Sequence, residues 1–221
     1  MTYKNNTDFS IDVGFIVNSD NIQKAVEQTN AFFVGLPSNL FRSIDYKTTS
    51  AMIGSIFCNT LATITGSVVN PIEKGHPDII PAFAIGSSEE ELRNYPKGLE
   101  IKCTVGNITT GANLRAGETR IDSLTGITWQ AHHREVEKLL GIVWDFVNDE
   151  KSFNHPAITG AFYNDNLNEN DWGTISGTTG RNTKVSGMST SGKEKMGNGW
   201  VVLLDDEDYL SRYQRLLKFK I

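Results

Sequence analysis

Hydrophobic and polar residues recur along the first part of the chain with the periods of a strand and then of a helix. Residues 8–17 alternate apolar and polar side chains, which predicts a strand. A helix is expected next, because Ser19 or Asp20 can cap its start. Its apolar pattern runs to about Phe33, and Gly35 ends it.

A second helix is predicted over 46–64, where apolar residues recur every three or four positions. Gly66 ends it. The apolar positions are Met52, Ile53, Ile56, Phe57, Leu61 and Ile64. A stripe of this width predicts a well-buried helix.

Short apolar runs in the rest of the chain predict the strands. The runs 75–85 and 98–105 are expected to lie beside each other as a hairpin-like pair. Further along, Val136, Leu139 and Leu140 give a short helical stripe. Three more strands and an amphipathic C-terminal helix follow, at 141–147, 157–164, 199–204 and 207–220.

Helices precede and flank these strands, so the predicted fold class is α/β (α+β), with a central mixed sheet flanked by helices. A chain of 221 residues suits one domain, 1–221, with a sizeable core. Two long segments rich in Gly, Ser, Thr and Asn, about 106–128 and 165–198, do not match this scaffold. The second could form a hairpin turning at Gly180 and Arg181. Long polar excursions usually carry binding, and plain surface decoration is the alternative.

Composition and charge narrow the class of protein. The chain is 38% hydrophobic and 21% charged, and no apolar run approaches the roughly 20 residues that a membrane helix needs. The N-terminus lacks the profile of a signal peptide, so we expect a cytoplasmic protein. Cys58 and Cys103 have no metal-site spacing and are expected to be free thiols. The net charge of −5 argues against a general nucleic-acid coat, although basic residues cluster in 181–195 and 211–220.

Three charged residues stand where the expected strand pair would bring them together. Asp78 lies in the first apolar run, and Glu100 and Lys102 share one face of the second. Two close carboxylates repel each other unless a cation lies between them, and Mg²⁺ prefers oxygen ligands of this kind. We therefore expect Asp78, Glu100 and the carbonyl oxygen of Ile101 to bind Mg²⁺. The ammonium of Lys102 would position a nucleophile or offset transition-state charge, which suits phosphodiester hydrolysis.

Each of these residues also has a plainer interpretation. Glu100 and Lys102 could form a charged pair on a solvated sheet face, worth a few tenths of a kcal/mol. Asp78 could be a turn or helix-capping aspartate.

The segments "GHPDII" and "GLEIKCTV" resemble the PD-(D/E)xK nuclease signature, through Pro77, Asp78, Glu100 and Lys102. A single chain of this length with large polar insertions is most similar to a type II restriction endonuclease. The resemblance implies a restriction-endonuclease-like core and Mg²⁺-dependent cleavage of double-stranded DNA to 5′-phosphate and 3′-hydroxyl ends. It also implies a prokaryotic, cytoplasmic homodimer with one active site for each DNA strand.

One feature of the chain departs from the family pattern. Some members carry another acid on the helix before the first motif strand, whereas 46–64 contains neither Asp nor Glu. Asp45 at the start of that helix and Glu73 just before the motif are the nearest acids, so the role of a fourth acidic group stays open.

Polar residues in and near the excursions have the chemistry needed to contact DNA. Arginine can bridge the acceptors of guanine and asparagine can bridge adenine, while other polar groups contact phosphates. The candidates are Asn113, Arg115, Arg120, Gln130, His133, Arg181, Asn182 and Lys184. The plainer alternative for Gln130 and His133 is a solvated helix start.

The sequence thus favours a sequence-specific, Mg²⁺-dependent DNA endonuclease. A structure-specific or repair nuclease of the same superfamily is the first alternative. A non-catalytic module that binds a polar ligand is the second.

Overall fold

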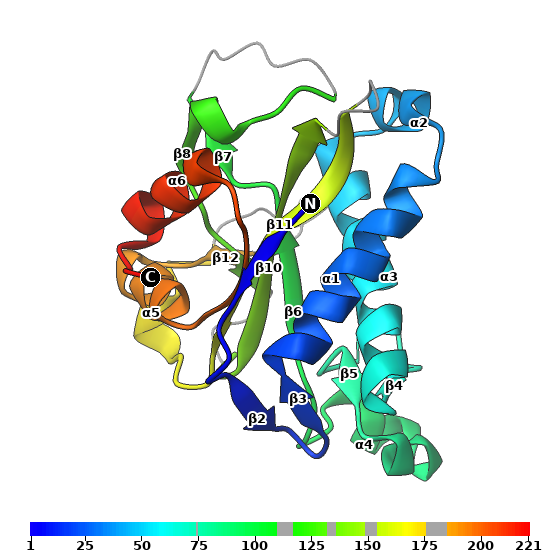
Figure 1. The fold of residues 1–221 in the computed structure, drawn as a ribbon. Helices are drawn as coiled ribbons and strands as arrows, with labels where there is room; N and C mark the ends of the chain where they lie inside the picture. Colours follow the sequence, from blue (N-terminus) through cyan, green and yellow to red (C-terminus); the bar gives the residue numbers. More distant parts are fainter. Residues whose placement is uncertain (74, 110–116, 132–135, 149–153, 176–184) are drawn as a thin grey trace.

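A computed structural model covers residues 1–221 and describes all of them except residue 74 and residues 110–116, 132–135, 149–153 and 176–184 (Figure 1). Its centre is a five-stranded mixed sheet with the strand order β1-β13-β11-β10-β6. β6 runs parallel to β10, and the other neighbours are antiparallel. The strands are β1 (Tyr3–Asn5), β6 (Ile101–Thr104), β10 (Leu139–Asn148), β11 (Asn154–Asn164) and β13 (Trp200–Leu204). The expected mixed sheet flanked by helices is confirmed.

Helices cover both faces of this sheet (Figure 1). The helices α1 (Ser19–Val34) and α3 (Tyr46–Thr65) bury one apolar cluster, which includes Trp144 of β10. The helices α5 (Thr190–Asn198) and α6 (Glu207–Leu217) bury a second cluster on the other face, which includes Phe162 of β11. Within the described ranges, none of the helices combines the length and the hydrophobicity of a membrane-spanning segment.

The ends of α3 follow from its sequence. The Asp45 side chain accepts a hydrogen bond from the backbone N–H of Thr48 at 2.7 Å, which satisfies one of the exposed donors of the first turn. Gly66 ends the helix with a left-handed φ of 68°. The helix predicted over 46–64 is therefore confirmed. The predicted α1 is confirmed too, although Asn18 caps it rather than Ser19 or Asp20.

The single strand predicted over 8–17 is wrong, because the chain folds there into a hairpin. Its strands are β2 (Ser10–Asp12) and β3 (Ile16–Asn18). The side chain of Asp12 accepts a hydrogen bond from the N–H of Gly14 at 2.8 Å, and Gly14 has a φ of 96°. This turn needs a residue that tolerates positive φ, and the alternation of apolar residues on either side concealed it.

The helical stripe predicted around Val136, Leu139 and Leu140 is also wrong, since β10 begins at Leu139. Leu139 and Leu140 point to the two opposite apolar clusters. A strand buried on both faces reads as a continuous apolar run, which periodicity alone does not separate from a helix.

The remaining elements are short. The strand predicted over 75–85 is reduced to β5, because Pro81 leads into a 3₁₀ turn. The short elements are α2 (Ser38–Ser43), β4 (Val68–Val69), β5 (Ile79–Ile80), η1 (Ala82–Gly86) and α4 (Glu89–Arg93).

The two polar excursions contain regular structure as well as undescribed residues. The first contains β7 (Asn107–Ile108), η2 (Ile121–Ser123) and β8 (Leu124–Gly126). The second contains η3 (Glu169–Asp171), β12 (Ser186–Gly187) and α5, and β12 pairs with β9 (Gln130–Ala131). The turn predicted at Gly180 and Arg181 lies outside the described residues.

Candidate functional site

The backbone bridge between Ile79 and Leu99 brings together the two segments that carry the predicted site residues. Their N–H and C=O groups exchange two hydrogen bonds, of 3.1 and 2.8 Å. Two residues further along, the N–H of Ile101 donates to Oδ2 of Asp78 at 2.7 Å. The hairpin-like strand pair predicted for 75–85 and 98–105 is reduced to this one bridge, because β5 pairs with β4 and β6 pairs with β10. The bridge and the Ile101 hydrogen bond nevertheless fix Asp78 against the edge strand β6.

Asn70 holds the other side of the Asp78 segment. Its backbone N–H donates to the carbonyl oxygen of Asp78 at 2.9 Å. Its buried side-chain amide donates to the carbonyl oxygens of Pro77 and Leu92, at 3.1 and 2.8 Å. Pro77 precedes β5 and Leu92 lies in the last turn of α4, so the amide satisfies one backbone carbonyl from each element and ties the Asp78 segment to that helix.

The three charged residues predicted from the sequence converge at the open edge of β6. The ammonium of Lys102 is hydrogen-bonded to Oε1 of Glu100, and its Nζ lies 3.8 Å from Oδ2 of Asp78. The Glu100 side chain is only 8% exposed, against 32% for Asp78. A surface charge pair would leave both partners in water, so this geometry disfavours the interpretation of Glu100 and Lys102 as a solvated pair.

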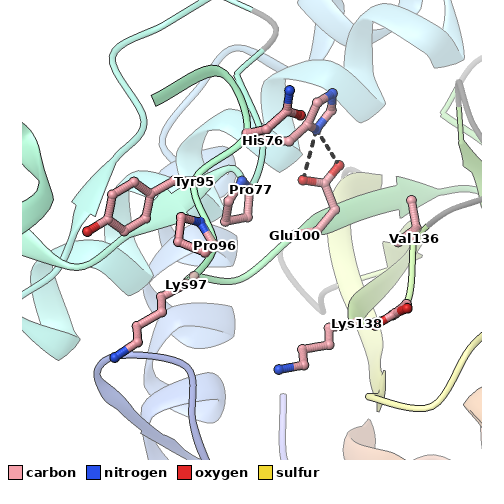
Figure 2. Close-up of a pocket in the computed structure, with 11 residues that line it drawn as sticks. His76, Pro77, Tyr95, Pro96, Lys97, Glu100, Val136 and Lys138 are labelled. Carbon is pink, nitrogen blue, oxygen red and sulfur yellow. Dashed lines mark hydrogen bonds and ion pairs between the residues drawn. The ribbon is translucent and has the colours of Figure 1, made fainter. Parts of the chain in front are cut away.

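His76 is a fourth member of this cluster that the sequence analysis missed. Its Nδ1 lies 3.1 Å from both carboxylate oxygens of Glu100, and Figure 2 shows the imidazole directed at that carboxylate. The motif segment contains His76 directly before Pro77 and Asp78, but the chain bends at both of these residues, so strand alternation does not predict its position. We name His76, Asp78, Glu100 and Lys102 the carboxylate cluster.

The carboxylate cluster shifts the titration of all four members. Burial and the neighbouring Glu100 charge raise the pKa of Asp78 above its ordinary value. Burial alone would also raise the pKa of Glu100, but the His76 hydrogen bonds and the Lys102 charge outweigh it and lower that pKa. Burial opposes ionisation of Lys102 too, yet the two carboxylates raise its pKa. The hydrogen bond to Glu100 raises the pKa of His76.

This charge balance suits a divalent cation next to Asp78. The Lys102 ammonium is paired with Glu100 and its Nζ lies 3.8 Å from Asp78, whose pKa is raised by burial and by the Glu100 charge. In the described part of the chain, no three His, Cys, Asp or Glu side chains group as a ready set of metal ligands. Asp78 and Glu100 supply two carboxylates at this edge, and the carbonyl oxygen of Ile101 is a further oxygen next to them.

The geometry of β6 directs the Ile101 carbonyl toward Asp78. The backbone N–H of Leu140 in β10 donates to the backbone carbonyl oxygen of Glu100, so the backbone N–H and C=O of Glu100 point toward β10. The N–H and C=O of one strand residue point to the same side, and those of the next residue point to the other. The N–H of Ile101 donates a hydrogen bond to Asp78 on the open side of β6, so the carbonyl oxygen of Ile101 lies on that same side. Carboxylate and carbonyl oxygens are ligands that Mg²⁺ accepts, with water completing its shell.

A pocket of about 620 Å³ opens over Asp78 and Lys102, between α3 and β6. Ser50, Ser55 and Asn59 of α3 line its far wall. We name it the α3 pocket. Cys58 and Cys103 also line it, and burial raises the pKa of both thiols, so they are neutral there. The α3 wall provides uncharged donors and acceptors opposite the charged edge of β6.

Most of the predicted DNA contacts lie outside the described residues: Asn113, Arg115, His133, Arg181, Asn182 and Lys184. Gln130 lies in β9 with an exposed side chain. Arg120 is buried, with its guanidinium 4.7 Å from the Tyr46 ring centre and its Nη2 donating to the carbonyl of Gly106 at 3.1 Å. Its part in this structure is internal packing, because a base contact would need an exposed guanidinium. Of the two acids nearest the motif, Asp45 caps α3 and Glu73 is exposed.

No protein-family model, curated protein or solved structure matches this chain. The carboxylate cluster and the resemblance of the motif are therefore the features that bear on its function.

Replacing His76 by leucine is expected to destabilise the fold by about 1–2 kcal/mol at pH 6, because buried Glu100 loses its hydrogen bonds from the imidazole. The His76 pKa is raised in the folded state, so this stabilisation is complete below its unfolded value, roughly 6.5, and is lost as pH rises through the folded value. Thermal unfolding at pH 6 and pH 9 measures the difference between wild type and variant.

His76→Asn is the matched control, since its amide nitrogen occupies nearly the position of Nδ1 and keeps a neutral hydrogen bond. The His76→Asn variant should lose only the part of the unfolding free energy that depends on pH. An equal penalty at both pH values for His76→Leu would contradict a charged His76–Glu100 pair.

Proposed function

We propose that this chain is a Mg²⁺-dependent endonuclease that cleaves double-stranded DNA at a specific sequence, as type II restriction enzymes do. The observation that carries the proposal is the convergence of Asp78, Glu100 and Lys102 at one edge of β6. These are the residues through which the sequence resembles the PD-(D/E)xK signature. A mixed sheet with α1 and α3 on one face is compatible with a restriction-endonuclease-like core.

The chain's own residues divide the chemistry between them. Asp78, Glu100 and the Ile101 carbonyl would hold Mg²⁺, which when bound supplies a Lewis acid that activates water and offsets phosphate charge. Lys102 keeps its proton because its pKa is raised, so its ammonium can orient a water molecule or a phosphate oxygen. His76 keeps the Glu100 carboxylate in place through both oxygens.

DNA fits this site better than a small phosphodiester, because the α3 pocket is open and has a wall of serine and asparagine side chains. The excursions at 106–128 and 165–198 are the proposed regions of base contact. Two-stranded cleavage of a near-palindromic site calls for a homodimer. A prokaryotic, cytoplasmic setting belongs to the same proposal.

Incubation of the purified chain with phage DNA tests the proposal. Discrete fragments with 5′-phosphate ends are expected in Mg²⁺, and uncut DNA is expected when EDTA removes the metal. A smear, or cleavage confined to branched DNA, would instead favour the structure-specific nuclease. Uncut DNA under all conditions, with no Mg²⁺ or Mn²⁺ binding near Glu100, would leave only the non-catalytic module.

A further inference from the structure

A second pocket, of about 310 Å³, lies on the other side of the carboxylate cluster from the α3 pocket. Figure 2 shows Tyr95, Pro96 and Lys97 along one wall and Val136 and Lys138 along the other, with Glu100 between them. We name it the Lys97 pocket. Its volume is at the lower end of the roughly 300–1,000 Å³ typical of small-ligand sites, so it suits one compact group.

The fold explains why these two walls meet. Lys97 lies just before β6 and Lys138 just before β10. β6 and β10 are parallel neighbours with Ile101 opposite Leu140, so the residues that enter both strands lie at the same end of the sheet. Two segments far apart in the sequence thus place one exposed lysine each beside Glu100.

Both ammonium groups are available to an anion. Within the described residues, neither Lys97 nor Lys138 makes a hydrogen bond or an ion pair, and both are exposed. The Glu100 carboxylate in the pocket is already paired with the Lys102 ammonium. Glu137 is the other acid in the lining, so the pocket keeps a positive balance. Prolines and the ring of Tyr95 provide an apolar surface next to this charge.

The position of the Lys97 pocket relative to the cluster suggests what it binds. His76 lines both this pocket and the α3 pocket, so the carboxylate cluster separates two adjoining cavities. A DNA strand whose reacting phosphate lies at Asp78 and Lys102 has to pass out of the α3 pocket on one side. The Lys97 pocket is the cavity it meets there, and its lysines match a backbone phosphate.

We propose that the Lys97 pocket binds the nucleotide next to the cleaved phosphodiester, with Lys97 and Lys138 contacting its backbone phosphate. This inference rests on the proposed function and deepens it, because it assigns the path of the substrate strand across β6. The apolar wall packs against the sugar or base without reading sequence, and Lys97 and Lys138 act as charged contacts.

The test measures binding of a short DNA duplex in Ca²⁺ over a range of salt concentrations, with Lys97→Ala, Lys138→Ala and the double variant. Each lost phosphate contact should reduce the slope of log K against log salt by about one. In Mg²⁺, KM should rise while kcat changes little. Lys97→Arg and Lys138→Arg should keep the slope, because they keep the charge.

Lys24→Ala is the matched control, since Lys24 is an exposed lysine of α1 away from the pocket. If the wild type binds and cuts DNA while the pocket variants behave like Lys24→Ala, the pocket assignment is wrong and the nuclease proposal survives. If the wild type neither binds nor cuts DNA, the proposed function fails and this inference fails with it.

Discussion

Asp78→Asn should lower the rate of DNA cleavage by about three orders of magnitude, equivalent to roughly 4 kcal/mol in the activation barrier. The substitution removes a carboxylate proposed to hold Mg²⁺, while it keeps the size of the side chain. The amide oxygen of asparagine can still accept the hydrogen bond that the Ile101 N–H now gives to Oδ2. The variant is therefore expected to fold, and the loss is a loss of chemistry.

The rate should be measured in single-turnover cleavage, together with DNA binding in Ca²⁺. Binding is expected to stay within a few-fold of wild type, since the positioning contacts lie outside Asp78. Asp8→Asn serves as the matched control, because Asp8 is an exposed acid distant in sequence from the motif. Cleavage by Asp78→Asn within tenfold of wild type would remove Asp78 from the site and with it the main support for the nuclease proposal.

The meeting of Asp78, Glu100 and Lys102 could be predicted because it depends on local rules. Residues i and i+2 of a strand share a face, and the apolar residues around them mark both segments as backbone-paired. The boundaries of α3 were predictable for the same reason, since Asp45 and Gly66 are local signals at its ends. The ends of α3 needed only the chain within a few residues, whereas the approach of Asp78 to Glu100 also needed the two segments, 22 residues apart, to lie side by side.

The features that the sequence did not disclose depend on distant parts of the chain. Lys138 reaches the site through the parallel register of β10 with β6, which no local pattern encodes. Arg120 has the residue type of a base reader, but its burial against Tyr46 is a property of the folded core.

The helix α5 was missed because its Gly, Ser and Lys residues have the composition of a loop. It forms because Ser189 caps its first turn and Met196 is buried in the second apolar cluster. Gly192 is also required, since an added Cβ would lie 2.6 Å from the carbonyl oxygen of Asp171. Tertiary packing here overrides a weak helix propensity.

Gly98 is the position where the approach of the two motif segments is most sensitive to a side chain. Its φ is 142°, a conformation that residues with a Cβ rarely adopt. A Cβ at this position would lie 2.2 Å from the carbonyl oxygen of Ile79 and 2.4 Å from Cγ of Pro77. Those atoms flank Asp78, so any relief of the clash moves the Asp78 segment away from Glu100.

Gly98→Ala is expected to cost about 3–5 kcal/mol of folding free energy, from backbone strain and from the forced separation of the segments. In the fraction that remains folded, cleavage should fall by at least about a hundredfold, because a displacement of roughly 1 Å at a reacting centre has effects of this size. Denaturant unfolding gives the first quantity, and single-turnover cleavage at low temperature, with folding verified by circular dichroism, gives the second. Gly86→Ala is the control, since an added Cβ there meets nothing within 4 Å. If Gly98→Ala cleaved DNA at the rate of Gly86→Ala, the distance between the two segments would not set the activity, and the carboxylate cluster would lose its proposed role.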